Sequence, residues 1–193
     1  MKNNYENIKF LLDFSNEGDF YFVQIIKRRK DDGNEDMSRG ERIVDNFYIH
    51  SMEEYDKYKE RILESVRINN ARAYIHINKR NLKRIALAVN KLIGEYLLSE
   101  QYKAVKNAYT TACGRYSATS GSDRRWIIDA DTPEEIISIR NFLNEIKAEV
   151  IMELPTKNGL HFITKPFNVM LYEKEFGFKE DIKKNSPTLL AWN

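Results

Sequence analysis

The chain has 193 residues, of which 42% are hydrophobic and 31% charged, and this suits a single domain over residues 1–193 and excludes wholesale disorder. The lone cysteine, Cys113, excludes an internal disulfide and a cysteine zinc cluster, so no zinc is expected. A net charge of +2, with no apolar run long enough to cross a bilayer, predicts a cytoplasmic protein with no membrane partner and no strongly basic surface.

The first half of the chain reads as mixed α/β. Residues 20–26, 43–50 and 73–78 are rich in aromatic and branched side chains and are typical of strands. Apolar residues recur at helical spacing from residue 53 to residue 66, and again from residue 82 to residue 97. The run TSGSD at 119–123 indicates a loop. We therefore expect an N-terminal α/β part over 1–118 and a C-terminal half over 119–193.

Local signals are strongest in the C-terminal half. Residues 125–131 form a short apolar strand that ends in acid. Thr132, Pro133 and Glu135 then predict a helix start with a capping box. Residues 150–154 read as a second strand, and Asn158-Gly159 is a tight-turn signal before a third strand at 160–164. The predicted order is β-α-β-β.

The two aspartates at the end of the first of these strands should share one face. Residues two apart in a strand project to the same side, so Asp129 and Asp131 project together and the helix covers the opposite, apolar side. The crossover makes the 150–154 strand parallel to the aspartate strand. The turn at 158–159 then brings His161 close to Asp131.

Paired carboxylates repel each other unless a cation lies between them, and oxygen ligands suit Mg²⁺ or Mn²⁺. Such ions bridge to substrate phosphates. His161 could contact a phosphate oxygen, and Lys157 and Lys165 would add positive charge at the same rim. A plainer interpretation stays open for Asp131, which could simply shape the turn before the helix.

Two short motifs carry a resemblance to a known family. Asp129-Ala130-Asp131 is a D-x-D at a strand end, and residues 156–161, with Thr156, Gly159 and His161, read T-x-x-G-x-H. This pattern resembles the archaeo-eukaryotic primase superfamily, which includes the primase-polymerases. The resemblance implies an α/β (α+β) fold in which an RRM-like β-α-β-β catalytic half packs against the N-terminal part.

The resemblance also implies a site and an activity, namely template-directed nucleotidyl transfer in DNA replication with two divalent metal ions. Asp129 and Asp131 would hold metal, and His161 would bind the phosphates of the nucleotide. Thr156 and Gly159 would shape the nucleotide-binding loop. Asp181 is the best match for a third acidic ligand, with Glu153 as the alternative.

The implied partners are nucleoside triphosphates, a single-stranded nucleic-acid template and a separate helicase or replication protein. The basic residues that could contact the template backbone are Lys79, Arg80, Lys83 and Arg84. The chain departs from the family where Lys157 and Asn158 replace the Gly and Arg of many relatives. A catalytically inactive nucleic-acid-binding or interaction module therefore stays open as an alternative.

The pair His76 and His161 raises a different enzyme class, the two-histidine phosphodiesterases. Those enzymes need Ser or Thr two residues after each histidine. Asn78 and Ile163 occupy these positions, so this class is excluded.

Overall fold

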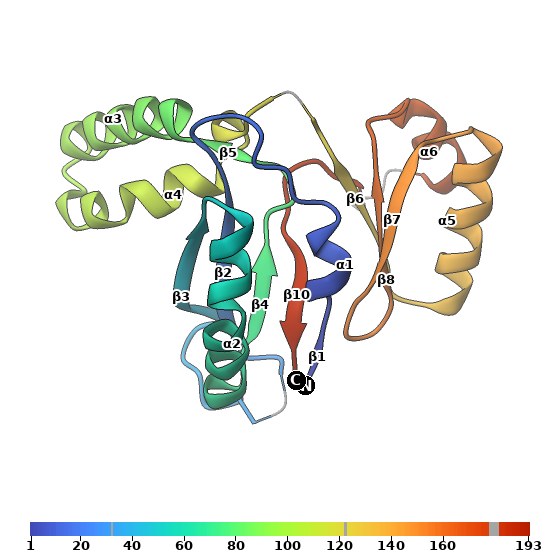
Figure 1. Cartoon of the computed structure of the whole chain (residues 1–193), viewed down its shortest axis with the longest axis horizontal. Coiled ribbons are helices and arrows are strands. Elements are labelled where there is room, and N and C mark those ends of the chain that lie inside the picture. The colour runs from blue at the N-terminus through green and yellow to red at the C-terminus, as the bar shows by residue number, and fades with distance from the viewer. Residues whose placement is uncertain (32, 122, 178–181) are drawn as a thin grey trace.

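The computed structural model describes residues 1–31, 33–121, 123–177 and 182–193, and these form two antiparallel sheets with flanking helices (Figure 1). In the first sheet the strand order is β1-β10-β4-β2-β3, and β5 pairs with one end of β2. The strands of this sheet are β1 (Lys2–Asn3), β2 (Asp19–Arg28), β3 (Glu41–Ile49), β4 (Arg72–Ile75), β5 (Arg80–Asn81) and β10 (Thr188–Trp192). The mixed α/β prediction for the first half is confirmed, with β4 shorter than the predicted 73–78 strand.

Alternation along β2 divides the first sheet into two faces. Tyr21, Val23 and Ile25 pack toward α2, whereas Phe20 and Phe22 pack beneath α3 and α4 on the opposite face. The helical segments of this half are α1 (Tyr5–Lys9), α2 (Met52–Asn69), α3 (Leu82–Leu98), η1 (Tyr102–Asn107), α4 (Ala108–Gly114) and η2 (Tyr116–Ala118). In Figure 1, α3 and α4 extend beyond the sheet, while α2 lies across its front.

The second sheet has the order β7-β8-β6-β9 and contains the predicted β-α-β-β run. A further helix and strand complete a β-α-β-β-α-β unit, the split β-α-β arrangement. Its elements are β6 (Trp126–Ala130), α5 (Pro133–Glu145), β7 (Val150–Pro155), β8 (Leu160–Thr164), α6 (Val169–Phe176) and β9 (Ile182–Lys183). Since β7 and β6 are each antiparallel to β8, they run parallel to each other, as the crossover argument predicted.

The start of α5 follows its sequence signals closely. The Thr132 side chain accepts from the Glu135 backbone amide, the Glu135 side chain returns to the cap, and Pro133 occupies the first helical position. This helix packs on the Ile128 and Ala130 face of β6, as expected. Asp129 is therefore on the opposite face, which turns toward the first sheet.

The last strand corrects the predicted division at residue 119. β10 does not join the second sheet but inserts between β1 and β4 of the first, which brings the two chain ends side by side (Figure 1). Ile127, Leu154 and Ile163 of the second sheet share one core cluster with Leu190 of β10 and with α1. The two halves are thus joined by a strand and a common core.

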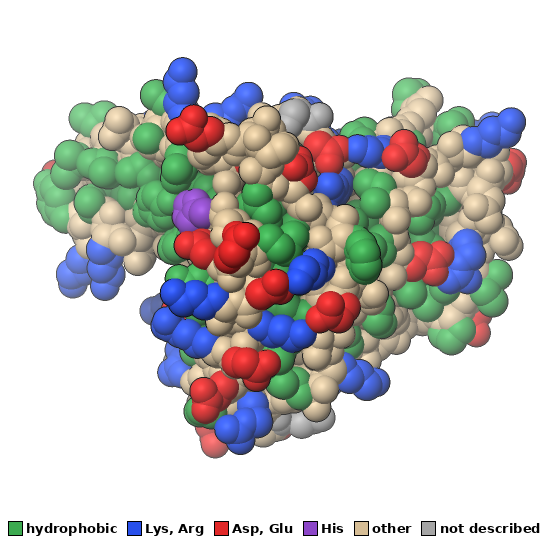
Figure 2. Space-filling view, in the orientation of Figure 1, with side chains coloured by type: hydrophobic (Ala, Val, Ile, Leu, Met, Phe, Trp, Pro, Cys, Tyr) green, Lys and Arg blue, Asp and Glu red, His purple; other side chains and the backbone are tan. Residues whose placement is uncertain are grey.

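Charges of both signs are mixed over the face shown in Figure 2, while apolar side chains gather over the projecting α3 and α4. The large exposed hydrophobic residues of α3 are Leu82, Leu87, Leu97 and Leu98. Among the described residues, no helix is both long and apolar enough to cross a membrane.

Candidate functional site

Asp129 and His161 lie directly opposite each other on neighbouring strands. They are register partners of the antiparallel β6–β8 pair. His161 Nε2 is 3.1 Å from Asp129 Oδ1, and His161 Nδ1 is 2.8 Å from Thr188 Oγ1. The imidazole is buried between a carboxylate of one sheet and a hydroxyl of the other. The predicted meeting of acid and histidine is found, with Asp129 as the direct partner.

The second oxygen of Asp129 binds a lysine that the sequence reasoning missed. Lys183 of β9 places Nζ 2.6 Å from Asp129 Oδ2. The hydrogen bond from His161, reinforced by the one from Lys183, holds the pKa of the Asp129 carboxyl far below its ordinary range, although partial burial acts the other way. Asp129 is consequently an anion throughout the physiological range, as a metal ligand must be.

Asp131 follows directly after β6 and is exposed. Its backbone amide donates to Glu135 Oε2 at 2.9 Å, so the residue does take part in the turn before α5. Its side chain also lines the cavity described below. Both interpretations of Asp131 are thus compatible with its position.

Thr156 and Gly159 close the turn of the β7–β8 hairpin, and Gly159 lies against the end of β6. The Thr156 amide donates to the Gly159 carbonyl at 2.9 Å, and the Gly159 amide donates to Thr156 Oγ1 at 3.0 Å. A Cβ on Gly159 would lie 1.9 Å from the Ala130 carbonyl oxygen, inside van der Waals contact. The hairpin can approach the aspartate strand this closely only because residue 159 lacks a side chain.

These residues surround a cavity of about 700 Å³ between the two sheets. Asp129, Asp131, Thr156, Lys157 and His161 all line it, so five of the predicted site residues converge. Cationic side chains reach it from both halves of the molecule, with acids interspersed. These cations are Arg28, Lys30, Arg72, Lys157 and Lys183.

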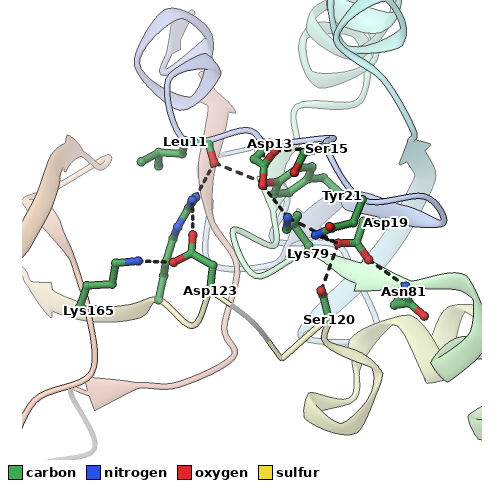
Figure 3. A network of polar contacts seen from close by, with 12 residues as sticks. Leu11, Asp13, Ser15, Asp19, Tyr21, Lys79, Asn81, Ser120, Asp123 and Lys165 are labelled. Atoms are coloured by element: carbon green, nitrogen blue, oxygen red, sulfur yellow. Dashed lines mark hydrogen bonds and ion pairs between the residues drawn. The ribbon is translucent and has the colours of Figure 1, made fainter.

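Other predicted site residues lie elsewhere. Lys165 is bonded to Asp123 near the joint between the halves (Figure 3). Glu153 is paired with Arg140 of α5 at 2.7 Å and does not line the cavity. Asp181, the expected third acid, lies outside the described residues.

The expected template contacts are corrected in part. Lys79 is 6% exposed and lies 2.7 Å from Asp13 and 3.4 Å from Asp19 (Figure 3). Arg80 is completely buried. Neither side chain is available to a phosphate backbone in this fold. Lys83 and Arg84 are exposed at the start of α3, away from the cavity.

Arg80 instead holds His76 in a neutral state. His76 Nδ1 lies 2.7 Å from Arg80 Nη2 and 3.2 Å from the Asn185 carbonyl oxygen, and because a guanidinium can only donate, Nδ1 is the acceptor in the shorter contact. Burial, with the positive Arg80 beside it, lowers the pKa of His76 to about 3. His76 therefore belongs to the core and not to a catalytic pair with His161.

This lowered pKa predicts a pH-dependent stability. In the unfolded chain His76 is protonated below its ordinary pKa of about 6.5, whereas in the folded protein it stays neutral down to about pH 3. The free energy of unfolding therefore falls as the pH drops through this interval. The slope contributed is at most about 1.4 kcal/mol per pH unit. Urea unfolding of His76→Asn, which retains an acceptor for Arg80, should show a flatter decline between about pH 6 and pH 4. Equal slopes in both proteins would contradict the assignment.

The cavity contains two carboxylates, the kind of group that holds a hard divalent cation when substrate phosphates complete its shell. Magnesium is usually held by one or two carboxylates together with substrate phosphates and water. Asp129 and Asp131 supply two such carboxylates on one cavity. Among the described residues, no group of three or more His, Cys, Asp or Glu side chains is arranged to hold a metal ion.

Comparison with protein-family models, with curated proteins and with solved structures finds no match to this chain.

Proposed function

We propose that this chain is a metal-dependent nucleotidyltransferase of primase-polymerase type, which uses nucleoside triphosphates on a single-stranded nucleic-acid template. The observation that supports it most is the convergence of Asp129, Asp131, Thr156, Lys157 and His161 on one cavity. These residues are the D-x-D motif and the T-x-x-G-x-H motif that resemble the primase superfamily. The β-α-β-β-α-β order of the second sheet is compatible with the RRM-like half that this resemblance implies.

The chemistry assigns a role to each group. In nucleotidyl transfer a strand's terminal hydroxyl oxygen attacks the α-phosphorus of the triphosphate and pyrophosphate leaves. Asp129 and Asp131 would hold divalent ions, which when bound neutralise the phosphates and promote in-line displacement. Thr188 orients the His161 ring with Nε2 toward Asp129 Oδ1, and a bound phosphate oxygen would take the place of that carboxylate oxygen as the partner of Nε2. Lys157 and Lys183 place positive charge beside the phosphates.

A second candidate, a catalytically inactive module of the same fold, is favoured by one contact. Both oxygens of Asp129 are already engaged, one by His161 and one by Lys183. If Lys183 stays on the carboxylate when nucleotide binds, it excludes a metal ion from that oxygen. The two candidates differ in whether metal increases triphosphate affinity.

Replacing His161 with glutamine tests the phosphate role. A hydrogen bond to a charged group contributes about 1.5–3 kcal/mol, so His161→Gln should weaken binding of a fluorescent triphosphate in Mn²⁺ by about ten- to hundredfold. The exposed histidine His50 offers a matched control, and His50→Gln should bind like the wild type. Unchanged affinity in His161→Gln would remove His161 from the site, and metal-independent affinity in the wild type would favour the inactive module.

A further inference from the structure

Beyond Phe22 the helix-covered face of β2 opens into a second and larger cavity. Phe20 and Phe22 lie beneath α3 and α4, but Gln24, the next residue on the same face, lines a cavity of about 1280 Å³. Asn46 of β3 and Thr110 of α4 line it as well. The face that α2 covers, which Figure 2 presents, lies on the other side of the sheet.

One cross-strand row joins this cavity to the Asp129 site. Asn46 is the register partner of Gln24, Gln24 of Tyr74, and Tyr74 of Leu189. Asn46 and Gln24 line the larger cavity, whereas Tyr74 and Leu189 line the cavity of Asp129 and His161. With adjacent strands about 4.8 Å apart, this row of four residues spans about 14 Å. We call it the sheet row.

The side chains of the sheet row suit a single strand of nucleic acid. Gln24 Nε2 donates to Asn46 Oδ1 at 3.0 Å, which leaves further amide donors and acceptors for base edges. Tyr74 lines the Asp129 cavity, and its hydroxyl accepts from Arg28 Nη1 at 3.2 Å. An aromatic ring of this kind offers a base a stacking surface without sequence preference.

The rim of the larger cavity has a positive charge balance once the ion pairs of its acids are taken into account. Arg39 and Arg42 are exposed at its rim. Two of the acids along it are already neutralised by neighbouring arginines. These pairs are Glu41 with Arg28 at 2.9 Å and Asp45 with Arg61 at 3.4 Å. The cations Lys27, Arg39 and Arg42 then exceed the remaining acid, Asp36, so the rim attracts a phosphate backbone.

We propose that the sheet row is the track along which a single-stranded nucleic acid reaches the Asp129 site. Arg39 and Arg42 hold its phosphates, and Tyr74 stacks on the base nearest the site. That the strand acts as a template rests on the proposed function, whereas binding of the strand does not require catalysis. The track replaces Lys79 and Arg80, which burial removes from the surface.

Fluorescence anisotropy with a labelled oligothymidylate tests the track on the full chain, without metal or triphosphate. The double variant Arg39→Gln/Arg42→Gln should bind at least about fivefold more weakly than the wild type. Because each phosphate contact on a single strand contributes about 0.7 to the slope of log affinity against log salt, the slope should fall by about 1.4. The matched control Lys57→Gln/Arg67→Gln removes the same charge from exposed positions of α2, on the other side of the sheet, and should retain the wild-type affinity and slope.

The proposal is overturned if the track variant binds like the wild type, if the α2 control loses as much affinity, or if the wild type binds no strand. Triphosphate binding measured on the same samples keeps the two proposals apart. If the wild type binds no triphosphate, the proposed nucleotidyltransferase function is refuted. The track is then still tested by whether the arginine substitutions weaken strand binding.

Tyr74→Leu tests the stacking contact separately from the electrostatic attraction of the strand. Loss of a stacking partner should weaken strand binding by about tenfold and leave the salt slope unaltered, because stacking releases no counterions. Wild-type affinity in Tyr74→Leu, or a changed salt slope, would remove Tyr74 from the track.

Discussion

Replacing Gly159 with alanine is expected to lower the free energy of unfolding by about 3 kcal/mol or more, at the upper end of overpacking effects. The added Cβ would meet the Ala130 oxygen at 1.9 Å and Asp131 Cα at 2.8 Å. Both are backbone atoms, so no side-chain rotation relieves the clash. The hairpin must move away from β6, and His161 must move away from Asp129 with it.

The urea midpoint and the affinity for triphosphate should therefore both be lower in Gly159→Ala than in the wild type. The matched control is Gly94→Ala in α3, where a Cβ would meet nothing within 4 Å. That change should increase stability by up to about 1 kcal/mol, because alanine favours helix over glycine. A Gly159→Ala protein with the wild-type urea midpoint would refute the close approach of the hairpin to β6.

Replacing Arg80 with leucine is expected to cost about 3 kcal/mol of stability or more, because three buried acceptors would lose their donor. The guanidinium donates to the Cys113 carbonyl at 2.6 Å, to the Asn78 carbonyl at 2.8 Å and to His76 Nδ1 at 2.7 Å. Burial lowers its pKa to about 10, so it stays charged at neutral pH. Within the described residues no carboxylate pairs with the guanidinium. Its positive charge is stabilised instead by the negative end of the α4 dipole at Cys113.

Leucine would leave these buried acceptors without donors, each at a cost of about 1–3 kcal/mol. Arg84→Leu, at an exposed position of α3, should change stability by no more than about 0.5 kcal/mol. Chemical denaturation of the two variants measures the difference. Equal stability of Arg80→Leu and Arg84→Leu would contradict the buried network.

The elements around the site could be predicted because their signals are local. The capping box of Thr132 and Glu135, the alternation in 125–131 and the Asn158-Gly159 turn each act within a few residues. Together they place β6, α5, β7 and β8 and bring Asp129 opposite His161. The crossover rule then supplies the parallel relation of β6 and β7.

The contribution of the first sheet to the site could not be predicted in the same way. β10 pairs with β4 across more than a hundred positions, and no local pattern in 188–192 indicates that pairing. Because of this pairing, Thr188 contacts His161, and Leu189 lines the cavity beside Tyr74. Lys183 likewise depends on the pairing of β9 with β6.

Arg80 was misplaced for a physical reason. Lysine and arginine are almost never fully buried, so a basic run such as 79–84 is typical of a solvated face. The carbonyls that satisfy Arg80 come in part from Cys113, thirty-three positions away. The Cys113 carbonyl comes close to Arg80 only through the tertiary packing of α4, which no local sequence pattern indicates.

Template-dependent incorporation of nucleotides tests the central claim most directly. Loss of groups that merely support a metal ligand typically costs ten- to hundredfold, so loss of the ligand Asp129 should cost at least about a hundredfold. With Mn²⁺, triphosphates and a single-stranded template, we expect incorporation by the wild type and by the control Glu134→Gln, and its loss in Asp129→Asn. No incorporation by the wild type, or full activity of Asp129→Asn, would contradict the account.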